Sequence, residues 1–182
     1  TALFWAGSVA TGRAVAGNVP PLSINFWRWA VGFVLIAPFG LSGLWRNWPT
    51  VRAHWRILLL LGFSNMTAFG SLLFVGLEMT QAINGALLQG SMSLTIVAMS
   101  LVLLGVRITL SQGCGIAFAF LGVVTIVARG DPAALLSLRL NVGDLIIWVG
   151  VLFYSLYSVY LPRAPKTLRL VELMTVFCFV GA

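Results

Sequence analysis

The stretch ILLLLGFSNMTAFGSLLFVGL runs from Ile57 to Leu77 without a charged side chain. A helix that crosses the hydrocarbon core of a bilayer needs roughly 20 predominantly apolar residues, so this stretch is long enough to form one. Apolar and polar residues do not alternate along it, as they would in a strand of a membrane β-barrel. The stretch therefore predicts a membrane-spanning α-helix.

Similar apolar stretches cover most of the chain on both sides of this one. They predict six membrane spans and the start of a seventh, over residues 1–16, 22–45, 57–77, 79–106, 108–128 and 145–162, and from residue 170 onward. Segments rich in Pro, Gly, Asn and Arg separate several spans, at 17–21, 46–49 and 129–132, because such residues end helices or favour turns. Thr1 and Ala182 both fall within apolar stretches, so we expect the chain to be a fragment of a longer protein.

The composition excludes the common classes of soluble protein. Only 8% of the 182 residues are charged, whereas soluble domains carry about 25% charged residues. Such a chain is not an ordinary cytosolic enzyme, a disordered tail or a secreted disulfide scaffold. The net charge of +7 does not indicate a nucleic-acid partner, because the basic residues form short clusters between apolar stretches, as the positive-inside rule describes.

The same basic residues predict how the chain is oriented. Arginine and lysine are enriched in the cytoplasmic loops of membrane proteins. One side of the predicted spans carries Arg129 and Arg139, and the other carries Arg46, Arg52, Arg56, Arg107, Arg163, Lys166 and Arg169. We therefore expect a multi-pass protein of the plasma or inner membrane, with its N-terminal end in the cytoplasm.

Short motifs follow one another along the chain in a fixed order. They are FWAGS at 4–8, Gly12-Arg13, Pro20-Pro21, Trp27-Arg28-Trp29, TQAINGALL at 80–88, Gln112-Gly113, FLGV at 120–123 and Gly143-Asp144-Leu145. Their order, spacing and loop lengths resemble the EamA-type members of the drug/metabolite transporter superfamily. The chain departs from that family at Ser91-Met92-Ser93, where members often carry a proline, and at Gly105-Val106-Arg107, where they often have Gly-Glu-Arg.

The resemblance implies an all-α, polytopic membrane helix bundle of two inverted five-helix repeats, with a substrate path near its centre. Residues 1–129 would form the first repeat without its start, 130–141 an external connection, and 142–182 the start of the second repeat. An odd number of spans inverts the second repeat relative to the first, which suits alternating access.

Arg13 and Arg28 are the charged residues that fall inside predicted spans. A charge in a span is costly and usually faces protein or water. We expect both in the outer half of neighbouring helices, where they would form a cationic wall that favours anionic substrates. Snorkelling of these side chains to lipid headgroups is the alternative. Glu78, at the external end of the third span, is a candidate for an ion pair with either arginine or for coupling to protons, and a solvated helix end is its alternative.

Four further residues complete the set of substrate-cavity candidates, namely Trp5, Ser8, Asn65 and Gln89. A buried amide in lipid is costly without partners, so Asn65 should face the bundle. For Asn65 and Gln89, cavity lining and interhelical hydrogen bonding are equally good interpretations.

Two expectations concern local geometry. The helical spacing of Ser64, Thr67 and Ser71 predicts that they share one face of the third span. Asn141 or Asp144 is expected to cap the sixth predicted span, and a proton site is the alternative for Asp144.

The leading functional hypothesis is a secondary transporter that exports a small metabolite or drug-like solute by alternating access. No Walker-type phosphate loop is present, and neither a cofactor nor a metal is expected. We do not expect an enzyme, because the single histidine, His54, falls in a loop and no pair of aspartates falls in the spans. The alternative is a non-transporting membrane partner or sensor. The expected partners are a small-molecule solute and the lipid bilayer, with a homodimer as an option.

Overall fold

The computed structural model describes residue 7 and residues 19–106, 109–127 and 141–182. The regular secondary structure in these residues is entirely helical. The elements are α2 (Pro21–Arg46), α3 (Trp48–Ala53), α4 (Trp55–Gly62), the π-helix η1 (Phe63–Phe69), α5 (Gly70–Met79), α6 (Ala82–Gly90), α7 (Met92–Leu104), α8 (Leu110–Val127), α10 (Val142–Tyr160), the 3₁₀ turn η2 (Leu161–Arg163) and α11 (Leu170–Gly181). The predicted all-α class is confirmed.

Four segments of the described chain are long and apolar enough to cross a membrane. They are Pro21–Arg46, Trp55–Met79, Asn84–Leu104 and Val142–Arg163, and two shorter apolar helices cover Leu110–Thr125 and Leu170–Gly181. These segments coincide with the second to seventh predicted spans, whereas the first predicted span lies outside the described residues. Large apolar side chains such as Phe39 (76% exposed) and Val102 (80% exposed) point outward. A lipid-facing surface of this kind confirms a multi-pass membrane helix bundle.

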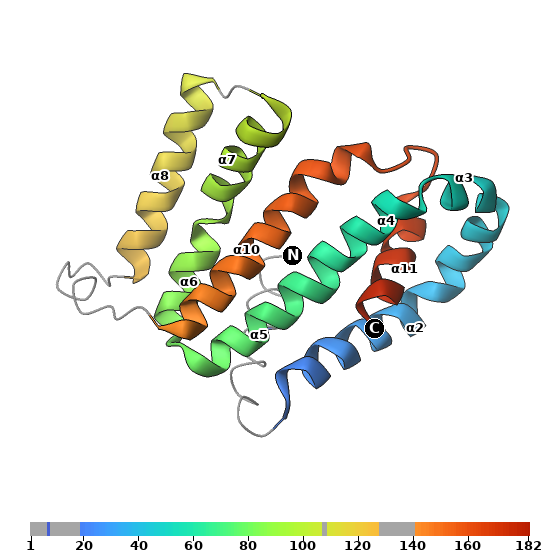
Figure 1. The fold of residues 1–182 in the computed structure, drawn as a ribbon, viewed down its shortest axis with the longest axis horizontal. Helices are drawn as coiled ribbons and strands as arrows, with labels where there is room; N and C mark the ends of the chain where they lie inside the picture. The colour runs from blue at the N-terminus through green and yellow to red at the C-terminus, as the bar shows by residue number, and fades with distance from the viewer. Residues whose placement is uncertain (1–6, 8–18, 107–108, 128–140) are drawn as a thin grey trace.

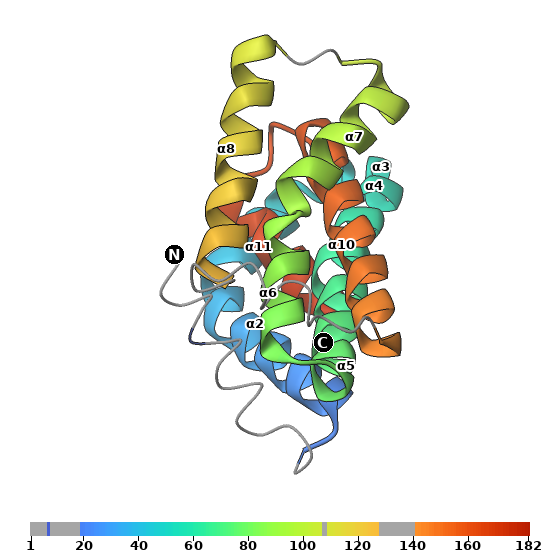
Figure 2. The same cartoon turned by 90° about the vertical axis from the view of Figure 1, so that its left-hand side faces the viewer.

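The helices pack around a rod formed by α4, η1 and α5 (Figure 1). α10 runs along this rod in the opposite direction, and α11 lies between α4 and α2. The view turned by 90° shows α6 and α7 between α8 and α10 (Figure 2).

Glycines allow two of these helix pairs to approach closely. A Cβ atom on Gly76 of α5 would lie 2.7 Å from the carbonyl oxygen of Gly143 in α10. A Cβ atom on Gly40 of α2 would lie 1.9 Å from Oγ1 of Thr175 in α11. Small residues at such contacts let membrane helices pack by van der Waals attraction. The sequence thereby makes α5–α10 and α2–α11 two of the tight interfaces among the described helices.

The buried apolar side chains form two clusters. One surrounds Leu61 and Phe177, with Trp29 packed against it. The other surrounds Leu73 and Ile147, with Ile24 packed against it. The first turns of α2 therefore reach both clusters, and the polar residues between Ile24 and Trp29 are held between two apolar regions.

The structure differs from the sequence expectations at two breaks. The loop expected after residue 46 contains the short helix α3, which begins with Trp48 and carries Pro49 in its first turn. The fourth predicted span is divided at Ser91 into α6 and α7, although no proline is present there. The Ser91 hydroxyl donates to the Leu88 carbonyl oxygen at 2.6 Å, which occupies a carbonyl near the end of α6.

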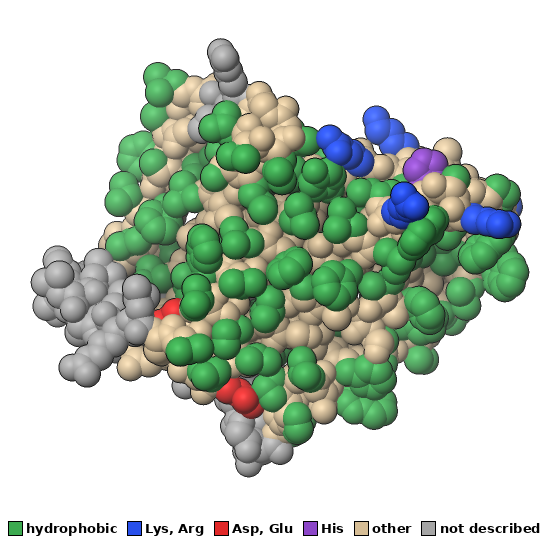
Figure 3. Space-filling model, in the orientation of Figure 1, with side chains coloured by type: hydrophobic (Ala, Val, Ile, Leu, Met, Phe, Trp, Pro, Cys, Tyr) green, Lys and Arg blue, Asp and Glu red, His purple; other side chains and the backbone are tan. Residues whose placement is uncertain are grey.

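Charged side chains separate along the length of the bundle. On the face drawn in Figure 3, basic side chains gather at the end where α3 and the α10–α11 connection lie, and acidic side chains appear towards the opposite end. Glu78 near the end of α5 and Asp144 near the start of α10 belong to that opposite end. This polarity matches the clustering of basic loops on one side of the predicted spans.

Candidate functional site

The backbone of the third span widens into the π-helix η1 at Phe63–Phe69. Single-turn π segments inside α-helices occur frequently at functional sites. Here the carbonyl oxygen of Met66 accepts two side-chain hydrogen bonds from α2, from Asn25 Nδ2 at 2.9 Å and from Trp29 Nε1 at 3.0 Å. The distorted turn therefore presents a backbone acceptor to the neighbouring helix.

Asn25 is the centre of this polar cluster. Its side chain is only 2% exposed. Besides Met66, its amide nitrogen donates to Ser71 Oγ at 3.2 Å, and its Oδ1 accepts from Arg28 Nη2 at 3.0 Å and from Trp29 Nε1 at 3.1 Å. A buried amide with this many partners is stabilising in a membrane, where an unsatisfied polar group is costly. We call Asn25, Arg28, Trp29 and Ser71, together with the Met66 carbonyl, the α2–η1 polar cluster.

Arg28 brings a positive charge into this cluster. With a rise of about 1.5 Å per residue, it lies about 10 Å along α2 from Pro21. Its guanidinium carbon lies 4.6 Å from the centroid of the Trp29 ring and 5.0 Å from that of Phe74. Cation–π contacts of this kind contribute about 0.5–2 kcal/mol, depending on desolvation. The guanidinium is thus held by aromatic rings of α2 and α5 and by the Asn25 amide.

Gly70 explains how α2 comes so close to the rod. A Cβ atom at Gly70 would lie 2.2 Å from Asn25 Oδ1 and 2.9 Å from Arg28 Nη2. No larger residue fits there without displacing the Asn25 side chain or one of the helices. The α2–η1 polar cluster therefore depends on the lack of a side chain at Gly70.

A second polar cluster joins the α5–α6 turn to the start of α10. Asp144 is 3% exposed, and its carboxylate accepts from the Thr80 hydroxyl, from Asn84 Nδ2 at 2.9 Å and from the Asn141 backbone N–H at 2.9 Å. The Asp144 N–H donates in return to Asn141 Oδ1 at 3.0 Å. This reciprocal pair is a capping box with Asn141 as the N-cap residue and Asp144 at the third helical position, so both residues expected as caps take part in it.

The structure places the remaining sequence-predicted candidates in different surroundings. Asn65 is half-buried in η1, and its side chain lies close to Tyr157 of α10. Gln89 is half-buried in α6, and Glu78 is exposed near the end of α5. The candidates that lie outside the described residues are Trp5, Ser8 and Arg13. The roles of all these residues in binding a solute stay predictions.

The expected shared face of Ser64, Thr67 and Ser71 crosses the junction of two elements, because the first two residues belong to η1 and the third to α5. Thr67 donates to the Val180 carbonyl oxygen of α11 at 2.9 Å, whereas Ser71 bonds Asn25 of α2. The polar residues of this span therefore serve different neighbouring helices.

Sequence reasoning missed Asn25 and the hydrogen bonds of Trp29. The available signal was their spacing, because Asn25, Arg28 and Trp29 follow the i, i+3, i+4 pattern that places residues on one face of a helix. No sequence pattern pointed to the Met66 carbonyl, since it becomes an acceptor for side chains only through the geometry of η1.

Comparisons with known proteins give one family and one relative. The sequence model described as "EamA-like transporter family" matches residues 1–128. A curated protein of Bacillus subtilis (strain 168), named "Uncharacterized transporter YyaM", is 29% identical over 182 residues, which are 99% of this chain and 59% of the relative. The chain thus spans 59% of the length of that relative. No solved structure matches the chain.

Proposed function

The chain belongs to the EamA-like transporter family, and from this premise we propose that the protein is a secondary transporter that moves a small metabolite or drug-like solute by alternating access. The direction we propose is export. The membrane is the plasma or inner membrane, with the N-terminal end and the basic end of the bundle in the cytoplasm. The clustering of basic residues at one end supports this orientation, because cytoplasmic loops are rich in arginine and lysine.

The observation that carries the proposal is the guanidinium of Arg28 inside the α2–η1 polar cluster. A charged residue at the centre of a membrane helix costs about 2.5–3.5 kcal/mol on insertion scales. Arg28 lies on a span yet is held by Asn25 and by two aromatic rings. Such an intramembrane charge marks a substrate path in many transporters. We propose that it attracts solutes with a carboxylate or another anionic group.

The proposed domain plan follows the repeats of the family. Residues 1–129 form the first repeat without its start, 130–141 the connection, and 142–182 the start of the second repeat. In this plan α2 and α11 are the second helices of their repeats, and they pack closely through Gly40 and Gly43 of α2. Inverted repeats of this kind move against each other in alternating access.

The test is solute flux into proteoliposomes that contain the complete gene product. Arg28→Gln removes the charge and Arg28→Lys keeps it, so we expect the first variant to lose uptake of anionic solutes at least tenfold more than the second. Uptake of neutral solutes should change little in either variant. Arg163→Gln is the matched control, because it removes an exposed arginine at the basic end.

Two results would contradict the proposal. Equal retention of anionic and neutral uptake in Arg28→Gln would remove Arg28 from the substrate path. A complete protein that moves no solute and only binds other membrane proteins would support the partner or sensor hypothesis instead.

A further inference from the structure

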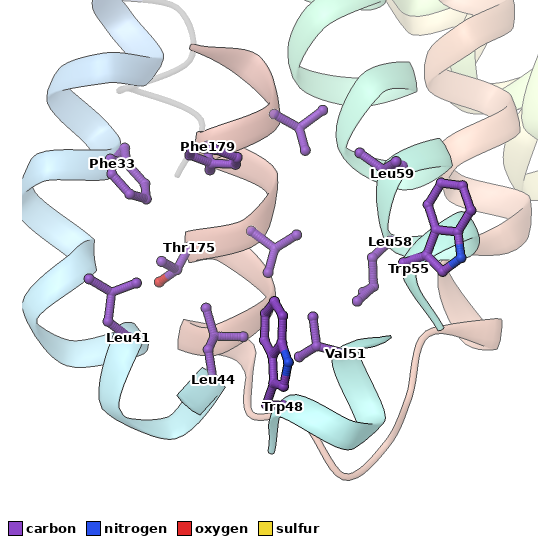
Figure 4. Close-up of a pocket in the computed structure, with 12 residues that line it drawn as sticks. Phe33, Leu41, Leu44, Trp48, Val51, Trp55, Leu58, Leu59, Thr175 and Phe179 are labelled. Atoms are coloured by element: carbon purple, nitrogen blue, oxygen red, sulfur yellow. The ribbon is translucent and has the colours of Figure 1, made fainter. Parts of the chain in front are cut away.

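An apolar groove lies between α2, α3, α4 and α11, away from the α2–η1 polar cluster (Figure 4). Its volume is about 360 Å³, within the range of about 300–1,000 Å³ that is common for ligand sites. Apart from the two indole rings, the lining side chains are apolar except for Thr175. The Thr175 hydroxyl donates to the Val171 carbonyl oxygen of its own helix at 2.8 Å. The groove therefore suits an apolar occupant rather than a polar solute.

The packing of α11 explains why the groove exists. Gly40 and Gly43 bring α2 tightly onto one part of α11, since Cβ atoms there would meet Thr175 and Glu172 within 2.0 Å. The short helix α3 then turns the chain, and α4 continues on the other side of α11 (Figure 1). The space between α2 and α4 is left open beside α3.

Tryptophans lie where the groove meets the basic end of the bundle. Trp48 and Trp55 line the groove and are 54% and 51% exposed. The Trp48 ring also stacks on the Trp45 ring, with the two centroids 6.1 Å apart. Tryptophan is enriched at membrane–water interfaces, where its amphipathic ring sits at the level of the lipid headgroups. The mouth of the groove is thus expected at headgroup depth.

Two exposed arginines directly follow residues that line the groove. Arg52 directly follows the lining residue Val51, and Arg56 directly follows Trp55, with its guanidinium carbon 5.6 Å from the centroid of the Trp55 ring. The acidic residue described at this end, Glu172, is 3% exposed and accepts from Asn47 Nδ2 at 3.4 Å and from the Arg169 N–H at 3.0 Å. The carboxylate is therefore engaged inside the protein, and the rim presents positive charge to its surroundings.

We propose that this groove binds an anionic phospholipid, with an acyl chain along α11 and the headgroup phosphate held by Arg52 and Arg56. Basic pockets between membrane helices on the cytoplasmic side bind anionic lipid headgroups in other proteins. The apolar lining matches the acyl chain, the interfacial tryptophans match the boundary between chain and headgroup, and the two arginines match the headgroup phosphate. These parts follow one another in the same order as in a bilayer lipid. A second copy of the chain fits less well, because a symmetric contact would bring two basic rims together. The proposal does not depend on solute transport.

The test is native mass spectrometry of the complete detergent-purified protein, titrated with palmitoyl-oleoyl-phosphatidylglycerol or palmitoyl-oleoyl-phosphatidylcholine. We expect one phosphatidylglycerol to be retained at least tenfold more tightly than phosphatidylcholine. The double variant Arg52→Gln/Arg56→Gln should lose about tenfold in affinity for phosphatidylglycerol, because each basic residue near an anionic headgroup contributes appreciably to attraction. Arg163→Gln/Lys166→Gln removes the same charge at the same end and should leave the affinity unchanged.

A second variant tests the apolar part separately. Leu59 lines the groove and is 43% exposed, so Leu59→Trp should fill the groove without disturbing the core. We expect it to lower retention of both lipids. The proposal is overturned if both lipids bind equally to the unmodified protein, if the control pair weakens phosphatidylglycerol as much as Arg52→Gln/Arg56→Gln, or if Leu59→Trp retains the lipid.

Discussion

Gly70 is the position where one added methyl group tests the construction of the α2–η1 polar cluster. In Gly70→Ala the new Cβ would lie 2.2 Å from Asn25 Oδ1. Asn25 cannot move aside freely, because it is 2% exposed and its amide nitrogen bonds Met66 and Ser71. Extra volume in a well-packed interior costs about 1–3 kcal/mol. This cost opposes the gain of roughly 0.5–1 kcal/mol that alanine has over glycine within a helix.

Gly122 in α8 provides the matched control. Apart from its own stretch of helix, no atom of the described residues would lie within 4 Å of a Cβ atom there, so Gly122→Ala should show only the gain from helix propensity. Both free energies of unfolding can be measured by titration with sodium dodecyl sulfate, followed by circular dichroism. We expect Gly70→Ala to be less stable than Gly122→Ala by about 1–3 kcal/mol, which is the cost of the added volume.

A double-mutant cycle identifies the cause of that difference. Asn25→Ala removes the nearest side chain that the new methyl group would meet and leaves Arg28 Nη2 at 2.9 Å, so Gly70→Ala should cost less on that background. The reasoning is refuted if Gly70→Ala is as stable as Gly122→Ala. It is also refuted if Gly70→Ala destabilises the protein equally with and without Asn25, because the clash would then lie elsewhere.

Three further predictions concern other parts of the bundle. Asp144→Asn removes the negative charge in the first turn of α10 and should lower the free energy of unfolding by about 1 kcal/mol; an unchanged detergent titration would show that this charge contributes nothing. Gly43→Ala places a Cβ atom 2.0 Å from Glu172 Oε1 and should destabilise the protein by about 1–3 kcal/mol, whereas a neutral effect in the same titration would mean that α2 and α11 pack less tightly than described. In detergent, a maleimide should modify the exposed Cys114 faster than the buried Cys178, and equal rates by mass spectrometry would contradict the described burial.

The spans could be predicted because their signal is local. Hydropathy and length alone placed the segment 57–77, and the structure shows an apolar helical segment at Trp55–Met79. The breaks between helices were harder to predict. One reason is that α3 is too short to show a clear periodic pattern of apolar residues. The division at Ser91 was also missed, since it uses a serine hydroxyl that bonds a carbonyl of α6 where a proline would be the usual signal.

The candidate site, like the fold, could be predicted only in part from the sequence. Arg28 could be predicted because a charge within a span is unusual whatever its neighbours are. Its partners could not, because Asn25, Trp29 and the Met66 carbonyl meet only after α2 packs on a π-helical turn. Whether a backbone turn widens in this way depends on tertiary contacts, which a single sequence does not contain.

The most direct test of the central claim is the water accessibility of position 28 in the membrane. Arg28→Cys and Val31→Cys, each made with Cys114 and Cys178 replaced by alanine, place a thiol about one turn apart on α2. Val31 is 53% exposed on the apolar surface, so its cysteine should react only with a lipid-soluble maleimide. The cysteine at position 28 should react with a charged, membrane-impermeant thiosulfonate. Reaction of position 28 with the lipid-soluble reagent alone would show that Arg28 faces acyl chains, which contradicts a solute path at this arginine.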